Sequence, residues 1–459
     1  MDKPQLRSEQ PSSDASESRE YTPRFVDIQA TYKYSRSVHG HVHETVQKVA
    51  GISKFEPLFP EQRAAAPLLE TAATLIGGAH RLSGHAGDGL VDALRPLLRQ
   101  MSSYYTNLIE GQHTRPADIE RAMTKQFDAD ETRARKQRLA AAHIEVEEEL
   151  ELAVVGNTAA ELFDPAFIAE IHERLYAKLP EADRVTDEGE PIEPGVYRTK
   201  DVVAGRHLPP RAEDVPEFMQ AWADRYRRLA GNDALAVGAV CSHHRLAWVH
   251  PFVDGNGRTA RLHTHLVFHA MGLTHGLWSP MRGLARTRAD YYDRLNNADL
   301  PRRNDLDGRG TLSQEELVKF AGYFLDTCVD QVNFMREQLA FDSLKERMST
   351  LLRHLQDNPW QIGSEKSVIK IEALEVLHYV AISGPLERGR FIGMTGVGDR
   401  TGRRVLQSLL DYGVLSSGST RAPVAFALPH KSLRFLFPNL WPEAEEDAER
   451  GSVDGARTI

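Results

Sequence analysis

Residue types used in phosphate chemistry occur together within one short stretch, residues 250–261 (HPFVDGNGRTAR). Pro251 ends any preceding helix, and the turn Gly255-Asn256-Gly257 tolerates positive φ and lets a ligand approach the backbone closely. When such a turn leads into a helix N-terminus, its successive N–H groups bind anions. The stretch therefore predicts a loop that holds phosphate groups.

The charged side chains around this turn extend the prediction. Arg258 and Arg261 lie three residues apart on the first turns of the expected helix, where a planar guanidinium can bind a phosphate through two N–H groups. Asp254 is a hard carboxylate that suits Mg²⁺ bridging phosphate oxygens. His250, at the loop entrance, can remove a proton from an attacking hydroxyl near neutral pH. A simple interhelical turn with a packed histidine and two surface arginines is the competing interpretation, and it accounts for fewer of these residues.

The same stretch resembles the motif of the Fic domain family, HPF-x-[D/E]-GNGR-x-x-R, at every fixed position. The resemblance extends over roughly residues 68–329. Fic proteins are largely helical, and they usually transfer AMP from ATP to a hydroxyl side chain of a target protein. The resemblance thus implies a mainly α fold with a Fic-type helical core. It also implies a protein adenylyltransferase, a nucleotidyltransferase that uses ATP and Mg²⁺ for AMPylation.

The resemblance also implies roles for individual residues. His250 would be the catalytic base that deprotonates the target hydroxyl, and Asp254 would hold Mg²⁺ on the α- and β-phosphates. The turn Gly255-Asn256-Gly257 would bind the phosphates together with Arg258, and Arg261 would hold the γ-phosphate. These roles agree with the interpretation from residue types alone.

Two further segments are similar to parts of Fic proteins. Residues 195–210 (GVYRTKDVVAGRHLPP) resemble the family's flap, a small β-hairpin that aligns the target by main-chain pairing. Tyr291 and Tyr292 resemble the paired tyrosines near the adenine, and we place both among the nucleotide-binding residues. Asp299 stands where some relatives carry an asparagine near the nucleotide.

A regulatory element is implied upstream of the motif. Residues 106–111 (TNLIEG) fit the inhibitory-helix pattern [S/T]-x-x-x-E-[G/N]. In relatives the glutamate pairs with the arginine that corresponds to Arg261, so Glu110 would take the place of the γ-phosphate charge and ATP would bind unproductively. A bidentate Arg–carboxylate pair is strong enough to compete with a phosphate. The chain would therefore be autoinhibited.

Composition limits the possible partners. The 459 residues include 56 Lys and Arg against 65 Asp and Glu, a net charge of −9, so nucleic acid could bind only at a local basic patch. Two cysteines cannot form a disulfide framework. No stretch approaches the ~18 apolar residues of a membrane span, and the first twenty residues lack the apolar segment of a signal peptide. We therefore expect a cytoplasmic protein.

Helical periodicity dominates between two polar ends. We expect helices over 67–109, 131–151, 165–177, 216–229, 234–248, 291–299 and 312–339, and one that follows Arg258. The charge-dense helix 131–151 is expected to be exposed, with its charges solvated. The predicted division is a disordered tail 1–20, an N-terminal helical region 21–180 with the inhibitory helix, a Fic core 181–340, a C-terminal domain 341–442 and an acidic tail 443–459.

The C-terminal domain has its own pattern. Two helices, a third helix over 398–412 and two short strands within 414–428 suggest a winged helix-turn-helix-like module. Arg400, Arg403, Arg404 and Arg421 could contact DNA phosphates, but such modules equally serve as docking or dimerisation domains, so DNA binding is possible and not favoured. His243, His244, His263 and His265 hint at a metal, but we expect them to pack or to face solvent.

Three functions compete. The favoured one is an autoinhibited protein adenylyltransferase whose partner is a target protein or the chain itself, and which could form a homodimer. The second keeps the Fic fold but removes AMP from a modified protein, or uses another nucleotide donor. The third is a DNA-binding regulator whose Fic core senses a nucleotide.

Overall fold

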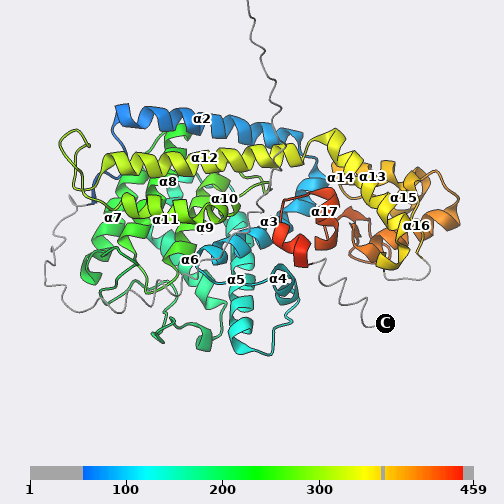
Figure 1. Ribbon diagram of the computed structural model, residues 1–459, viewed down its shortest axis with the longest axis horizontal. Helices are drawn as coiled ribbons and strands as arrows, with labels where there is room; N and C mark the ends of the chain where they lie inside the picture. Colours follow the sequence, from blue (N-terminus) through cyan, green and yellow to red (C-terminus); the bar gives the residue numbers. More distant parts are fainter. Residues whose placement is uncertain (1–54, 363–366, 448–459) are drawn as a thin grey trace, which may run out of the picture. The chain divides into compact units, whose positions relative to one another are not determined.

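The computed structural model describes residues 55–362 and 367–447, and these are mainly helical (Figure 1). The first helices are α2 (Gln62–His85), α3 (Asp88–Ile109), α4 (Pro116–Met123), α5 (Glu131–Ala153), α6 (Pro165–Ala177), α7 (Val215–Tyr226) and α8 (Asn232–Val249). They are followed by α9 (Asn256–Ala270), α10 (Met281–Arg286), α11 (Arg288–Asn297), α12 (Gln314–Gln338), α13 (Phe341–Asp357), α14 (Leu374–Ser383), α15 (Arg388–Met394), α16 (Asp399–Tyr412) and α17 (Leu433–Leu436). One antiparallel sheet, β1 (Leu415–Ser416) with β2 (Ala425–Phe426), is found in the described ranges. The mainly α fold is confirmed.

Local sequence signals explain where several helices begin and end. The Asp164 side chain accepts a hydrogen bond from the Ala166 N–H, and Pro165 occupies the first helical position, where a missing N–H costs nothing. α6 therefore starts and stops where the sequence predicts. The expected helix over 67–109 is divided into α2 and α3 near Gly87, where a Cβ would overlap the Ile382 carbonyl oxygen.

A contiguous set of buried apolar side chains runs from Phe55 to Ala444 and holds the helices together. α2 lies along α12 (Figure 1), and α8 packs against both of them and against α9. The loop between α8 and α9, which carries the motif, is therefore anchored at both ends to buried helices. None of the helices in the described ranges is both long and apolar enough to cross a membrane.

The expectation of an exposed helix over 131–151 is wrong. One face of α5 is buried, and this face includes Glu147 and Glu151, which are 2% and 4% exposed. The sequence pattern misleads because these carboxylates are not solvated. Glu151 instead pairs with Arg99 of α3 and His265 of α9. Charge density alone therefore does not mark a surface helix.

The flap segment is less regular than a hairpin. Within residues 195–210 one antiparallel bridge, between Ala204 and His207, closes a tight turn, and no strand is formed there. Pro209 and Pro210 lack N–H groups and so cannot extend a ladder. The chain nevertheless turns back on itself, as the resemblance implies.

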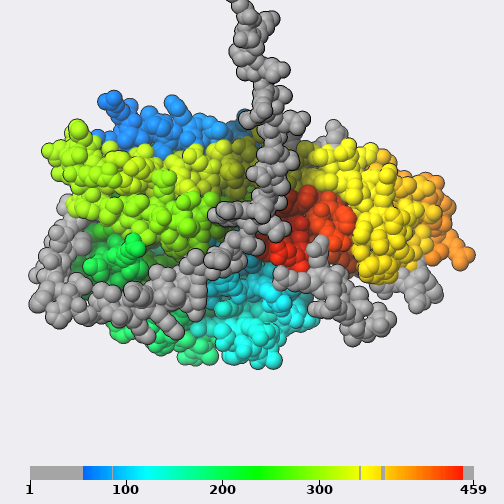
Figure 2. Space-filling view, viewed as in Figure 1, coloured from blue at the N-terminus to red at the C-terminus, as the bar shows by residue number. Residues whose placement is uncertain are grey.

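The C-terminal elements occur in the predicted order. α14, α15 and α16 precede β1 and β2, and an isolated bridge joins Leu386 to Val424. Figure 2 shows the C-terminal residues in red against α13 in yellow, in agreement with the contact of α13 with α17. The four expected arginines are exposed: Arg400, Arg403, Arg404 and Arg421. The assignment to the winged helix-turn-helix class stays a prediction, as do the domain boundaries.

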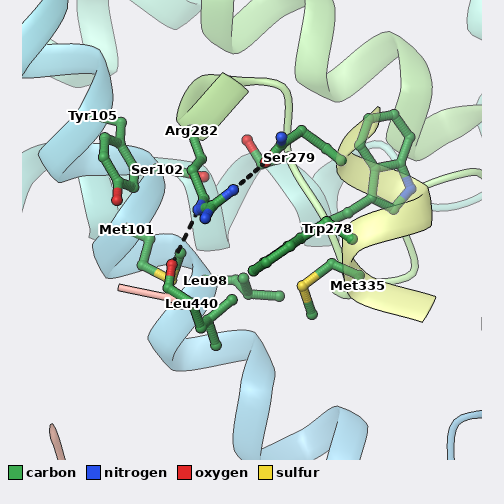
Figure 3. Close-up of a pocket in the computed structure, with 11 residues that line it drawn as sticks. Leu98, Met101, Ser102, Tyr105, Trp278, Ser279, Arg282, Met335 and Leu440 are labelled. Atoms are coloured by element: carbon green, nitrogen blue, oxygen red, sulfur yellow. Dashed lines mark hydrogen bonds between the residues drawn. The ribbon is translucent and has the colours of Figure 1, made fainter. Parts of the chain in front are cut away.

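Residues near the C-terminal end of the described chain contact α3 and α10. Arg282 donates hydrogen bonds to the carbonyl oxygens of Asn439 and Leu440, at 2.8 and 3.1 Å, and the Tyr105 hydroxyl donates to Glu443 at 3.0 Å. Beside Arg282, α3, α10, α12 and Leu440 enclose a cavity of about 20 Å³ (Figure 3). This volume holds about one water molecule, so the cavity is not a nucleotide site. Of the expected acidic tail only residues 443–447 are described.

Candidate active site

The motif forms a loop with two left-handed residues between two helices. His250 caps the end of α8 with φ 50°, and Gly255 caps the start of α9 with φ 78°. The Asn256 side chain braces the loop: its Oδ1 accepts from the Phe252 N–H at 2.9 Å, and its Nδ2 donates to the Phe252 carbonyl at 2.8 Å. Asn256 therefore shapes the loop with its side chain, and only its N–H stays available to a ligand.

The glycines leave space above the start of α9. No side chain among the described residues caps this helix, so its first N–H groups point outward without an intrahelical partner. A Cβ at Gly255 would lie 2.7 Å from the Tyr176 hydroxyl, and a Cβ at Gly257 would overlap Glu110 Oε1. The predicted turn is thus present at the start of α9, and the Glu110 carboxylate lies directly over it.

Asp254, Arg258 and Tyr176 form one hydrogen-bonded group beside the turn. Asp254 Oδ2 accepts from the Tyr176 hydroxyl at 2.9 Å and from Arg258 Nη2 at 3.0 Å. Burial raises the pKa of Asp254, but the positive charge of Arg258 and the Gly255 N–H outweigh it and lower the pKa. Asp254 is thus ionised at neutral pH. The Nε of Arg258 is buried and has no partner within the described ranges.

His250 lies at the loop entrance, and as a whole residue it is partly exposed. Burial lowers its pKa to about 4, and positive charge at His207 acts in the same direction. At neutral pH the ring is therefore uncharged and can accept a proton. The neutral form is the one that a general base requires.

Arg261 connects α9 to the end of α3. Its guanidinium pairs with Glu110 Oε1, and it also donates to Thr106 Oγ1 at 2.7 Å and to the Thr106 carbonyl at 3.2 Å. Glu110 is the C-cap residue of α3, and its side chain is 30% exposed. The structure thus brings together Thr106, Glu110 and Arg261, which are up to 155 residues apart.

The paired tyrosines both lie on α11. The Tyr292 hydroxyl donates to the Ile109 carbonyl at 3.0 Å, at the last residue of α3, and the ring is partly exposed. Tyr291 is 2% exposed and its hydroxyl is 2.8 Å from His243 Nε2. Tyr292 therefore lies beside Glu110, whereas Tyr291 is a packed residue of the core.

Three residues of the site were not predicted from the sequence. Tyr176 and His172 lie on α6, and the His172 ring stacks on Phe252 with centroids 3.9 Å apart. His172 Nδ1 accepts from the Gly195 N–H, and its Nε2 donates to the Asp254 carbonyl at 3.2 Å. His172 thus joins the flap to the motif loop. Arg198 does the same from the flap.

Arg198 donates through Nε to the His250 carbonyl at 2.8 Å and, through its backbone N–H, to the Pro251 carbonyl at 2.8 Å. Its side chain is fully buried, so it serves to hold the loop. Local spacing carries no signal for Tyr176 or His172, since α6 lies about 80 residues upstream of the motif. Arg198 stands within the flap resemblance, but its contact with the loop is not readable from that pattern.

The four histidines that hinted at a metal are all buried, and none faces solvent. His243 contacts Thr264, His244 contacts Asp299, and His263 contacts the Leu162 carbonyl. These three pack as expected. His265 differs, because it lies 2.9 Å from Glu151 and close to His269.

Comparison with known proteins supports these observations. Residues 162–268 match the model of the Fic/DOC family. Over 120 residues the chain is 36% identical to "Protein adenylyltransferase Fic" of Nematostella vectensis, covering 25% of this chain and 26% of that protein. Over 121 residues it is 36% identical to "Protein adenylyltransferase fic-1" of Caenorhabditis elegans, covering 26% and 22%. The chain thus spans about a quarter of the length of these curated relatives.

Solved structures of Fic proteins are also similar to this chain. A crystal structure of a Fic family protein from Desulfovibrio desulfuricans G20 covers 82% of this chain and 99% of its own, with 17% identity and a TM-score of 0.49. Residues 134–508 of Fic-1 from C. elegans cover 59% and 72%, with 19% identity and a TM-score of 0.44. The comparisons thus show that residues 162–268 of this chain are similar to the Fic/DOC family, and that about a quarter of the chain is similar in sequence to proteins named protein adenylyltransferase.

Proposed function

We propose that this chain is a protein adenylyltransferase that transfers AMP from ATP to a hydroxyl side chain of a target protein, and that Glu110 inhibits it. One observation carries the proposal: the Glu110 carboxylate pairs with Arg261 and lies over Gly257, where a phosphate would otherwise meet the start of α9. A carboxylate at a helix N-terminus is the protein's own substitute for a phosphate anion. The names of the curated relatives support the choice of AMP transfer.

The reaction needs little covalent chemistry from the protein. The target hydroxyl oxygen attacks the α-phosphorus of ATP, the bond from that phosphorus to the bridging oxygen of the β-phosphate breaks, and pyrophosphate leaves. The hydroxyl proton passes to His250, which is neutral at pH 7 because burial lowers its pKa to about 4. Positioning and neutralisation of charge supply the rest of the rate enhancement.

Each remaining group has a binding role in this scheme. The first N–H groups of α9 bind phosphate oxygens, and Arg258 offers a buried Nε–H that has no partner within the described ranges. Arg261 binds the γ-phosphate once Glu110 has left it. Buried N–H groups without a partner cost about 1–3 kcal/mol each, so an anion that satisfies them gains affinity.

The residues fit a magnesium ion. Asp254 is ionised, and its side chain is 42% exposed, so the carboxylate can face solvent or a nucleotide while one oxygen is held by Tyr176 and Arg258. Mg²⁺ in proteins is bound by one or two carboxylates together with substrate phosphates and water. When bound, the ion would neutralise charge on the phosphates.

The flap offers a surface for the target. Val203 and Leu208 are 68% and 65% exposed on either side of the bridge between Ala204 and His207. Exposed backbone next to exposed apolar side chains suits an extended target segment, which would pair through its main chain and leave its hydroxyl toward His250.

The experiment compares labelling by the wild-type chain and by Glu110→Gly, with Mg²⁺ and a tagged ATP, in a cell lysate and with the purified chain alone. Losing a charge-assisted Arg–carboxylate pair of about 1.5–3 kcal/mol predicts labelling increased about 10- to 150-fold. Glu110→Gln should give an intermediate increase, because the size is kept and the charge is lost. Glu188→Gly, in an exposed turn, is the matched control and should leave labelling at the wild-type level.

The product of the labelling separates the competing functions. Mass spectrometry of the modified target should find an added AMP. An adduct from another nucleotide, or loss of AMP from a previously modified target, would replace the proposed reaction by one of the alternatives. Equal labelling by wild type and Glu110→Gly would remove the inhibitory role. Homodimer formation and DNA binding through the C-terminal elements stay predictions.

A further inference from the structure

A polar cluster is buried between α5 and α9, about one helical turn beyond the active site. We call it the α5–α9 cluster, and it consists of Glu147, Glu151, His265 and His269. Each helix contributes two residues four positions apart, so both members of each pair lie on the same face. The side chains of Glu147, Glu151 and His265 are 2%, 5% and 3% exposed, and that of His269 is 20% exposed.

The ligand atoms of this cluster converge on one point. Glu151 Oε1 lies 2.9 Å from His265 Nε2 and 3.9 Å from His269 Nδ1. One atom from each of these three residues lies within 4.8 Å of the other two. In a tetrahedral zinc site with bonds of about 2.0–2.2 Å, neighbouring ligand atoms are about 3.4 Å apart. The observed separations bracket that value, so small side-chain movements suffice to seat an ion.

The surroundings of the cluster contain buried polar atoms that make no hydrogen bond. Glu147 Oε2 and both ring nitrogens of His143 are buried and make no hydrogen bond within the described ranges, and His143 Nδ1 lies 3.5 Å from Glu147 Oε2. The Oε1 of the same Glu147 carboxylate is 3.7 Å from His265 Nε2. Buried polar groups are nearly always satisfied, so these atoms indicate a bound species in this space. A second carboxylate next to two imidazoles favours a cation rather than a neutral ligand.

Arg99 of α3 orients the carboxylate that would ligate the ion. It donates to Glu151 Oε2 through Nε at 2.9 Å, and its Nη2 is 2.8 Å from the same oxygen. Glu151 Oε1 is thereby left facing the two histidines. A ligating carboxylate whose other oxygen is held by a hydrogen bond is usual in metal sites.

We propose that the α5–α9 cluster is a Zn²⁺ site, with Glu151, His265 and His269 as protein ligands and Glu147 balancing the charge. Two imidazoles and one carboxylate form a donor set that zinc prefers and that magnesium does not. Binding would replace two hydrogen bonds, one between His265 and Glu151 and one between His269 Nδ1 and Thr274 Oγ1. The alternative occupant of the same space is buried water, which the experiment distinguishes.

The site would fix α9 relative to α5. His265 follows Arg261 by four residues on α9, so an ion held by His265 and Glu151 constrains the helix that presents Arg258 and Arg261 to the active site. The role is structural, and it does not depend on the reaction proposed for the motif loop.

The experiment uses the full chain with His39, His41 and His43 changed to glutamine, since this histidine-rich stretch could bind zinc on its own. After removal of metals with a chelator, one equivalent of ZnCl₂ is added, and bound metal is counted by mass spectrometry and titration calorimetry. We expect about one zinc per chain and a higher melting temperature. We also expect Co²⁺ at this site to give visible bands of a tetrahedral nitrogen–oxygen complex.

Three variants test the ligands. His269→Gln, at the partly exposed edge, should keep the fold and weaken zinc binding at least about tenfold. Glu151→Gln should weaken it further. His263→Gln changes another buried histidine of α9 outside the cluster and should bind zinc like the parent. Absence of bound zinc in the folded parent, or unchanged affinity in both His269→Gln and Glu151→Gln, would overturn the proposal and leave buried water as the occupant.

Discussion

The two halves of α9 pair with carboxylates of upstream helices in different ways. At its start Arg261 pairs with Glu110 of α3, whose side chain is 30% exposed, and one turn later His265 pairs with Glu151 of α5, whose side chain is 5% exposed. An ion pair at the edge of solvent can exchange its carboxylate for a phosphate. A buried pair cannot, because removing one partner leaves an uncompensated charge. Burial therefore separates a contact suited to regulation from one suited to holding helices together.

The largest expected effect concerns His250, the proposed base, which lies in the motif loop that leads into α9. In a Glu110→Gly background, His250→Ala should lower AMP transfer about 10²- to 10⁴-fold, because general base catalysis contributes that much. The rate is measured with saturating ATP and a fixed target concentration. His354→Ala, on α13 far along the chain, should transfer AMP at the parental rate. Full activity in His250→Ala would remove His250 from the mechanism.

A stability measurement tests the buried pair, in which Glu151 of α5 contacts His265 of α9. Without added metal, Glu151→Ala should lower the free energy of unfolding by about 3–5 kcal/mol, because Arg99 and His265 lose their buried partner. Glu148→Ala removes the other carboxylate bound to Arg99, and its side chain is 56% exposed, so the expected loss is under about 1 kcal/mol. Urea denaturation of both variants gives the two values. Equal losses would contradict the distinction drawn between buried and exposed pairs.

Acid should weaken the fold through two histidines, His250 at the end of α8 and His269 near the end of α9. Burial lowers the pKa of His250 and of His269 to about 4, from 6.5 in an unfolded chain. Between pH 6.5 and 4 the unfolded chain therefore binds more protons, and stability falls as the pH falls, by up to about 1.4 kcal/mol per pH unit for each histidine. Above pH 6.5 both histidines are neutral in the folded and in the unfolded chain, so the stability no longer changes with pH through them.

Urea denaturation at pH 7 and pH 5 measures this effect. His265 acts with the opposite sign, because burial lowers its pKa but the hydrogen bond to Glu151 outweighs this and raises it. Its stabilisation is thus present below pH 6.5 and is lost as the pH rises through its folded pKa. An unfolding midpoint that is the same at both pH values would contradict the prediction for the buried neutral histidines.

The smallest expected effect concerns the hydroxyl that joins α6 to the motif loop. Tyr176→Phe removes one hydrogen bond to Asp254 and one from Arg258, at 2.9 and 2.8 Å. A loss of about 1 kcal/mol corresponds to roughly fivefold weaker transfer in the Glu110→Gly background. Tyr197→Phe, whose hydroxyl donates to the Pro165 carbonyl at 3.3 Å, is the matched control. A ratio of rates near one between the two variants would show that Tyr176 does not position Asp254.

The residues of the motif loop were predictable because they are adjacent in sequence and their geometry follows from local rules. Proline, two glycines and a helix start determine the turn, and His250, Asp254 and Arg258 follow from their places beside it. Glu110 was predictable only through the family resemblance, since nothing local connects it to Arg261. Helix bounds such as those of α6 followed from the cap at Asp164.

The rest depends on contacts between distant helices. His172 and Tyr176 look like ordinary helical residues until α6 is placed beside the loop. Glu151 looks like a solvated charge because the periodicity of α5 gives no sign that Arg99 and His265 cover it. The flap forms one bridge and no strand, in part because Pro209 and Pro210 have no N–H group to donate. The β-branched residues that favour a hairpin in the sequence do not reveal this.

The absence of a side chain at Gly257 has a consequence for how this chain can change over generations. The Glu110 carboxylate occupies the room that a Cβ would fill, and under the proposed mechanism an incoming phosphate needs the same room. A mutation at Gly257 would therefore remove both the inhibition by Glu110 and the transfer of AMP. Lineages that acquire a permanently active form should therefore carry a substitution at Glu110, directly after α3, and keep Gly257.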